Sequence, residues 1–92
     1  MMLVRWSPKA ADDLARIVKH IRRDSPEVAR RIAQTIYGRA GALGAFPNRG
    51  RIGRVEGTRE VPLPPLPFIV VYRVRERALE ISNILHGAQR WP

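Results

Sequence analysis

The clearest pattern of apolar and polar positions lies in the last third of the chain. In residues 68–74 (FIVVYRV) both alternating sets of side chains are largely apolar, which is typical of a strand inside a sheet. A second apolar run covers residues 79–85, and the charged link Arg75-Glu76-Arg77 between the runs is short enough only for a hairpin. We therefore predict that this hairpin forms the centre of a sheet that the rest of the chain covers.

Two segments with helical periodicity precede the hairpin, and each begins with a Ser-Pro dipeptide. Ser7 and Ser25 are favourable N-cap residues, and proline is accepted at the first helical position because its missing N–H would be unpaired there. The apolar stripes predict helices over residues 8–23 and from residue 26 to a C-cap at Gly44. The link between them is short, so we expect an antiparallel helical hairpin.

The remaining segments predict two further strands and one loop. Residues 3–6 form a short apolar run, residues 46–56 read as a loop, and residues 58–63 read as a strand. Four prolines between residues 62 and 67 forbid ladder hydrogen bonds there, so this strand is short or lies at an edge. The predicted fold is a single α+β domain over residues 1–92 with the order β-α-α-β-β-β, a helical hairpin on a small, mainly antiparallel sheet.

Length and composition narrow the class of protein. A chain of 92 residues has room for one modest core and gains stability from a partner. It has no cysteine, which excludes disulfides and thiolate metal sites. The uncharged run at residues 61–72 is far shorter than the roughly 20 residues of a membrane helix, and the N-terminus lacks the features of a signal peptide. We predict a cytoplasmic protein that does not enter a membrane.

The net charge of +9 is the strongest compositional signal. Of 17 basic residues only Lys9 and Lys19 are lysine; the others are arginine, whose planar guanidinium suits phosphate or carboxylate. A GC-rich genome could explain the ratio of arginine to lysine, but it does not explain the excess of basic over acidic residues. The charge predicts a polyanionic partner, either nucleic acid or an acidic protein.

Few residues offer recognisable chemistry. The sequence shows no metal-ligand spacing, no glycine-rich phosphate loop and no nucleophilic triad, so we expect neither a metal nor a cofactor. If the flanking strands bring Arg59 and His86 to one rim of the sheet, histidine could move a proton and arginine could offset phosphorane charge during RNA cleavage, with Glu56 or Glu60 as base. The alternatives are that His86 caps backbone or packs beside Trp91, and that Glu60 is an ion-pair partner.

Arginines outside this pair are candidates for contact with a target. Three of them lie in the predicted loop, where the alternative is a solvated connection. The candidate target-binding residues are Arg49, Arg51, Arg54, Arg73, Arg90 and Trp91.

Four segments, in order and with normal spacing, make the chain resemble the RelE/ParE superfamily of bacterial toxins. The segments are Trp6-Ser7-Pro8-Lys9-Ala10 with Asp13-Leu14, then Gly57-Thr58-Arg59-Glu60, then residues 67–74 (PFIVVYRV), then Leu85-His86-Gly87-Ala88. The resemblance covers essentially the whole chain. It implies the β-α-α-β-β-β architecture, growth arrest, plasmid stabilisation, and neutralisation by a small acidic antitoxin with a partly disordered segment.

The superfamily combines two activities on one fold. RelE-like members cut mRNA on the ribosome and ParE-like members poison DNA gyrase. In the RelE-like proteins an arginine lies just before the Val-Tyr pair of the central strand, and the matching position here is Ile69. A second position that is basic in those proteins falls near Ala88 and Gln89, which are uncharged, although Arg90 is close. The resemblance therefore favours a ParE-like toxin without nuclease activity, while a histidine at His86 favours the RelE-like alternative.

Overall fold

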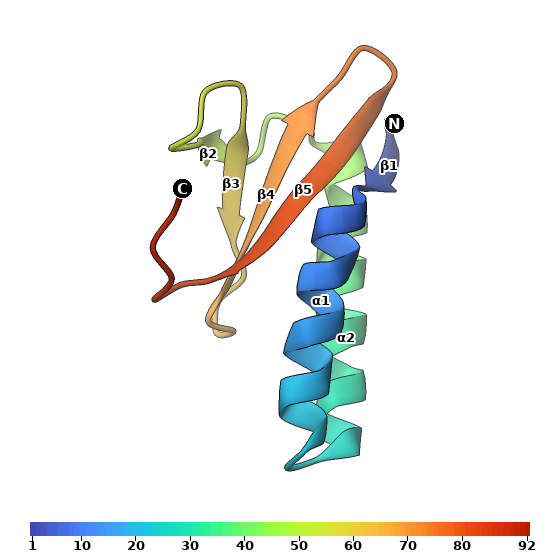
Figure 1. The fold of residues 1–92 in the computed structure, drawn as a ribbon. Coiled ribbons are helices and arrows are strands. Elements are labelled where there is room, and N and C mark those ends of the chain that lie inside the picture. The colour runs from blue at the N-terminus through green and yellow to red at the C-terminus, as the bar shows by residue number, and fades with distance from the viewer.

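Two antiparallel helices cover one face of a five-stranded sheet in the computed structural model, which describes residues 1–92 (Figure 1). The α+β class and the predicted element order are confirmed, with one additional short strand. In chain order the elements are β1 (Leu3–Trp6), α1 (Pro8–Arg22), α2 (Pro26–Gly41), the 3₁₀ helix η1 (Ala42–Ala45), β2 (Arg51–Ile52), β3 (Arg59–Pro62), β4 (Phe68–Val74) and β5 (Ala78–His86).

The strands are ordered β1-β5-β4-β3-β2, so the predicted hairpin β4–β5 does form the middle of the sheet. Both β3 and β5 run antiparallel to β4 and are therefore parallel to each other. Strand β1 is parallel to β5. The hairpin β4–β5 contains a bulge beside Val71 and Tyr72, at which the residue paired with Tyr72 is Ile81 and the residue paired with Val71 is Asn83.

Both helices begin as their Ser-Pro dipeptides predict. The hydroxyl of Ser7 accepts a hydrogen bond from the backbone N–H of Ala10 at 3.0 Å, and the hydroxyl of Ser25 accepts one from Val28 at 3.2 Å. Ser7 also donates to the carbonyl of Ser82 in β5 at 3.2 Å. The first cap therefore fixes the start of α1 to the sheet as well as to its own helix.

The predicted C-cap at Gly44 is wrong, because α2 ends at Gly41 and continues into η1. Gly44 is buried, and its carbonyl accepts a 2.8 Å hydrogen bond from the backbone N–H of Met2. A Cβ atom at this position would lie 2.4 Å from the Met2 carbonyl oxygen. Glycine is required here by the close approach of the N-terminal strand and not by the end of the helix.

The predicted loop over residues 46–56 contains the edge strand β2, which sequence patterning missed. Arg51 pairs with Glu60 and Ile52 pairs with Arg59 in a two-residue antiparallel ladder. The strand is too short for an alternating pattern to be read, and its side chains are exposed. Its position depends on contacts with β3 that only the folded chain provides.

The core lies between the helical hairpin and the sheet, on the face that carries Phe68, Val70 and Tyr72. Alternation along β4 places these three side chains on the helix side and Ile69 and Val71 on the other side. Neither helix is long and apolar enough to cross a membrane.

Candidate functional site

Arg59 and His86 do not converge, so the predicted catalytic pairing is wrong. Arg59 pairs with Tyr72 near the end of β4, whereas His86 pairs with Phe68 at its start. These positions are roughly 13 Å apart along β4 at about 3.3 Å per residue. Because β3 and β5 are parallel to each other, the start of one and the end of the other must lie at opposite ends of the sheet.

Arg59 has a structural role at its own end of the sheet. Its guanidinium donates to the backbone carbonyls of Gly50 at 2.7 Å and Asn48 at 3.4 Å. The fully buried Tyr72 acts beside it: its hydroxyl donates to the carbonyl of Pro47 and accepts from the N–H of Gly50, both at 2.8 Å. Together these two side chains satisfy the backbone of the segment that leads into β2.

Glu60 is an ion-pair partner and is poorly suited to act as a base. Its side chain is 1% exposed, and its two oxygens accept hydrogen bonds from Arg51 at 3.3 Å and from Arg54 at 2.9–3.2 Å. Burial would by itself raise the pKa of Glu60, but hydrogen bonds from the Arg54 side chain and backbone, a hydrogen bond from Arg51 and the Arg54 charge hold the pKa below 4.5, its ordinary value. A carboxylate held in this way resists taking up a proton.

The other candidate target-binding residues differ in what their side chains contact. Arg73 donates to the carbonyl of Glu56 at 3.2 Å and so helps to hold the β2–β3 turn. Arg49 and Arg90 are exposed, and their side chains take part in no hydrogen bond or ion pair. Trp91 is half-buried in the segment after β5, with a buried indole N–H that has no partner. Among the arginines of the predicted set, Arg49 and Arg90 therefore keep their guanidinium groups free.

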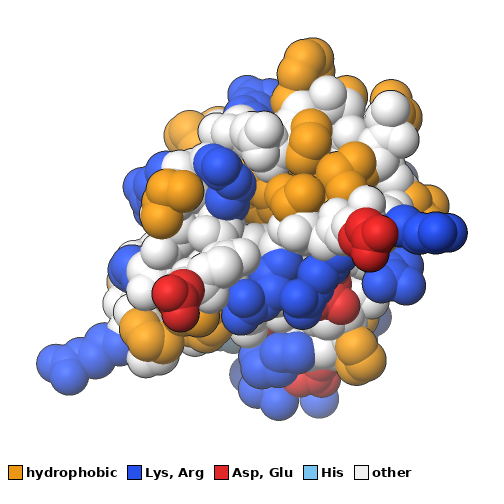
Figure 2. All heavy atoms as spheres, turned by 90° about the horizontal axis from the view of Figure 1, so that it is seen from above, with side chains coloured by type: hydrophobic (Ala, Val, Ile, Leu, Met, Phe, Trp, Pro, Cys, Tyr) orange, Lys and Arg blue, Asp and Glu red, His pale blue; other side chains and the backbone are white.

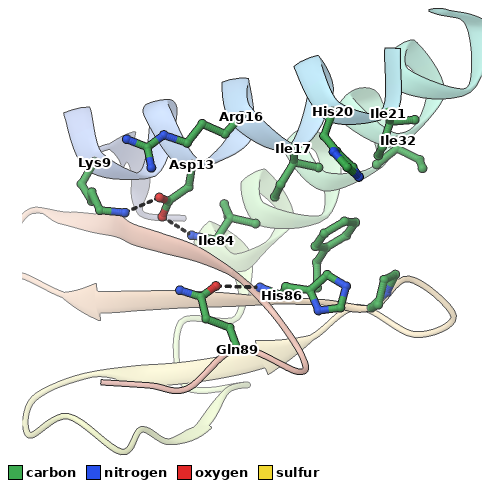
Figure 3. A pocket seen from close by; sticks show the side chains of 12 residues that line it. Lys9, Asp13, Arg16, Ile17, His20, Ile21, Ile32, Ile84, His86 and Gln89 are labelled. Carbon is green, nitrogen blue, oxygen red and sulfur yellow. Dashed lines mark hydrogen bonds and ion pairs between the residues drawn. The ribbon is translucent and has the colours of Figure 1, made fainter. Parts of the chain in front are cut away.

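A pocket of about 540 Å³ lies at the other end of the sheet, between α1 and the start of β4 (Figure 3). Its apolar wall comes from both helices and both central strands, and its rim is polar. The apolar side chains are Ile17, Ile21, Ile32, Phe68 and Ile84, and the polar ones are Lys9, Asp13, Arg16, His20, His86 and Gln89. The pocket therefore combines an apolar interior with a polar rim, on which Lys9 is paired with Asp13 and Arg16 with the exposed Asp12.

Both histidines of the chain line this pocket, although 65 residues separate them in the sequence. His86 packs edge-on against Phe68, with ring centroids 5.7 Å apart, and its Nδ1 accepts a hydrogen bond from the N–H of Ala88. The alternative role of His86 as a backbone cap is therefore observed. No role for His20 could be predicted from the sequence, because helical spacing does not indicate which strand end faces α1.

Asp13 is the single carboxylate of the pocket, and its charge is already neutralised. Its Oδ2 accepts from the backbone N–H of Ile84 at 3.0 Å and from Asn83 at 3.4 Å, while Oδ1 pairs with Lys9. These bonds join α1 to β5 just after the bulge. Within the resemblance Asp13 is part of a sequence motif, and the structure gives that motif a physical reason: a buried acceptor for the sheet backbone.

Comparisons with known proteins agree with this architecture. The family model described as "ParE toxin of type II toxin-antitoxin system, parDE" matches residues 4–91. The Sinorhizobium fredii (strain NBRC 101917 / NGR234) protein Y4kP, described as a toxin, is 37% identical over 89 residues, which are 97% of this chain and 92% of that protein. Toxin RelE2 of Caulobacter vibrioides is 33% identical over 97% of this chain and 99% of its own length.

A solved structure described as "Chromosomal ParDE TA system from P. aeruginosa" has a similar fold. The TM-score is 0.86 and the sequence identity 32%, over 94% of this chain and 96% of that chain. The family match spans nearly the whole sequence, and the relatives exceed 30% identity over nearly their full lengths. The resemblance to the RelE/ParE superfamily is confirmed, and this chain belongs to the ParE toxin family of type II toxin–antitoxin systems.

Proposed function

We propose that this toxin arrests growth in the bacterial cytoplasm by inhibiting DNA gyrase, without cutting RNA. The match to the ParE family over residues 4–91 carries the proposal. The geometry supports it, since Arg59 and His86 lie at opposite ends of β4 and the carboxylate of Glu60 is held by two arginines. Ile69, at the position where RelE-like proteins carry arginine, has no charge to offer a phosphate.

Membership of a toxin–antitoxin module implies a cognate antitoxin. We propose that an acidic segment of this antitoxin binds the pocket between α1 and β4. The apolar wall around Ile17 and Phe68 would receive apolar side chains. Arg16 on the rim, whose ion pair with Asp12 is exposed, would face a carboxylate of the segment. The pocket's own acid, Asp13, would not repel such a segment, because it is paired with Lys9 and bonded to the sheet.

The direct test is a supercoiling assay with purified DNA gyrase and the purified toxin, with and without the cognate antitoxin. We expect a dose-dependent loss of supercoiling that an equimolar amount of antitoxin reverses. Full supercoiling at saturating toxin, with a toxin preparation that arrests growth in cells, would contradict the proposal.

A RelE-like nuclease is the second candidate, and one observation favours it. His20 and His86 line one pocket with Lys9 and Arg16, and a pair of histidines with cations could transfer protons during phosphodiester cleavage. Mapping of mRNA ends within minutes of toxin induction separates the two candidates. New ends in translated messages that disappear in the double variant His20→Gln/His86→Gln would establish the nuclease, whereas intact messages with growth arrest support gyrase inhibition.

A further inference from the structure

Large apolar side chains are exposed at the end of the sheet opposite the pocket. Phe46 after η1 is 66% exposed, Ile52 of β2 is 77% exposed and Val74 at the end of β4 is 43% exposed. They come from three separate segments. Together with Asn48, Arg49 and Arg59 they are called the end surface below.

Two shallow hollows make the end surface continuous. One, of about 300 Å³, is lined by Asn48, Ile52, Arg59 and Val74 among others, and the second is lined by residues 45–49. Asn48 borders both hollows and so connects Phe46 with Ile52 and Val74. A continuous apolar surface with a polar rim is typical of a site that binds a partner.

The charges of the end surface are positive. In Figure 2, which views the molecule from above, apolar side chains gather from the middle to the upper edge of the face, and Lys and Arg side chains lie beside and below them and outnumber the acidic ones. The side chain of Arg49 has no hydrogen-bonding partner, and the guanidinium of Arg59 donates to backbone carbonyls and forms no ion pair. The complementary partner is therefore acidic.

The same contacts favour a protein over a nucleic acid. Nucleic-acid binding needs several cations that are free to contact successive phosphates. At this end Arg51 and Arg54 are paired with Glu60, while Arg59 and Arg73 donate to backbone carbonyls. The aliphatic side chain of Ile52 cannot bind a phosphate, but it can pack against an apolar side chain of a protein.

We propose that the end surface binds the toxin's target, through an acidic protein surface with an apolar centre. This inference rests on the proposed function, in which that target is DNA gyrase, and it adds the place and chemistry of the contact. The end surface and the pocket lie at opposite ends of β4, beside Val74 and Phe68. Target binding and antitoxin binding are therefore separable by mutation.

The experiment compares two pairs of matched variants of the full chain. Ile52→Asp changes the end surface, and Leu3→Asp is its control, since Leu3 is similarly exposed (65%) on the opposite edge strand, roughly 19 Å away across four strand spacings. Arg49→Glu reverses a free charge of the end surface. Its control is Arg30→Glu, which makes the same change of charge at an exposed position of α2. Circular dichroism and thermal unfolding establish that each variant folds.

We measure three quantities for each variant: growth arrest in cells, inhibition of purified gyrase, and affinity for the antitoxin by calorimetry. Ile52→Asp should raise the toxin concentration for half-inhibition about 30-fold, as for a central interface residue, and Arg49→Glu about tenfold. Both should keep their antitoxin affinity within about twofold. The two control variants should match the wild-type toxin in all three assays.

The outcomes are distinct for the inference and for the proposed function. If folded Ile52→Asp arrests growth as wild type does, or if it loses antitoxin affinity instead, the inference is wrong. If wild-type toxin does not inhibit gyrase, but Ile52→Asp abolishes growth arrest and keeps its antitoxin affinity, the proposed function fails and the end surface binds another target. Equal loss in Leu3→Asp would overturn the assignment to the β2 edge, because Leu3 lies at the same end of the sheet on the opposite edge strand.

Discussion

Two buried carboxylates show how single residues organise this toxin. Asp13 and Glu60 are both almost fully buried, and each receives hydrogen bonds from backbone N–H groups as well as from cationic side chains. Asp13 joins α1 to β5, and Glu60 holds the β2–β3 hairpin. Each acid therefore satisfies polar groups that would otherwise be buried without a partner.

Replacing Asp13 should destabilise the fold. Asp13→Ala leaves the N–H of Ile84 without its acceptor inside the protein, and we expect a loss of about 1–3 kcal/mol in the free energy of unfolding. Urea unfolding followed by circular dichroism measures it. Asp12→Ala is the control, because Asp12 forms an exposed ion pair with Arg16 and should cost less than about 0.5 kcal/mol. Equal losses in the two variants would contradict this role.

Stability should depend on pH through Glu60. Its pKa is lowered in the folded state, so its contribution is complete above 4.5, its ordinary value, and is lost as the pH falls through the lower folded-state pKa. Glu60→Gln should be less stable than wild type at pH 7, because an amide N–H₂ then faces the guanidinium of Arg54. The difference in free energy of unfolding should shrink below pH 4.5, as urea titrations at successive pH values can measure. A difference that stays constant from pH 7 to pH 3 would be inconsistent with the ion pair.

At the scale of the elements, α2 carries glycines that its packing does not need. Gly38 lies in the helix and is exposed, and a Cβ atom there would meet nothing within 4 Å. The stability of the helical hairpin comes from its apolar face, where Ile36 and Ala40 are fully buried. The exposed face therefore leaves room for a stabilising change.

Gly38→Ala should raise the free energy of unfolding by about 1 kcal/mol, because alanine loses less backbone entropy in a helix than glycine does. Thermal unfolding by calorimetry gives the sign and size. Gly44→Ala makes the same chemical change where the added Cβ would lie 2.4 Å from the Met2 carbonyl oxygen, and it should destabilise the protein. A lower melting temperature for Gly38→Ala would contradict the open surroundings of Gly38.

At the scale of the whole molecule, charge sets how the toxin meets its partners. The chain carries +9, and arginines lie at both proposed binding sites: Arg16 on the rim of the pocket, and Arg49 and Arg59 on the end surface. Long-range attraction of an acidic partner accelerates association and is screened by salt, whereas apolar contacts formed after docking govern dissociation. Antitoxin and target are therefore both expected to associate faster at low ionic strength.

The association rate of the antitoxin should fall about tenfold or more between 50 mM and 500 mM NaCl, with a smaller change in the dissociation rate. Surface plasmon resonance resolves the two rates. Arg16→Glu, on the rim of the pocket, should slow association further, and Arg30→Glu on α2 provides the control for net charge alone. An association rate independent of salt, or equal effects of the two variants, would argue against the pocket as the antitoxin site.

The amino-acid sequence by itself determined the elements of this protein and its family. Local signals were sufficient for the two Ser-Pro helix starts, the β4–β5 hairpin and the α+β class, since caps, periodicity and turn length act within a few residues. The four segments that resemble the RelE/ParE superfamily also identified the superfamily correctly.

Only the tertiary structure decided which side chains meet. The parallel relation of β3 and β5 separated Arg59 from His86, and the packing of α1 on β5 brought His20 and His86 to one pocket. Strand β2 and the true role of Gly44 likewise depend on contacts between segments far apart in the chain. Such contacts follow from strand order and layer packing, which a linear pattern of hydrophobic and polar residues does not encode.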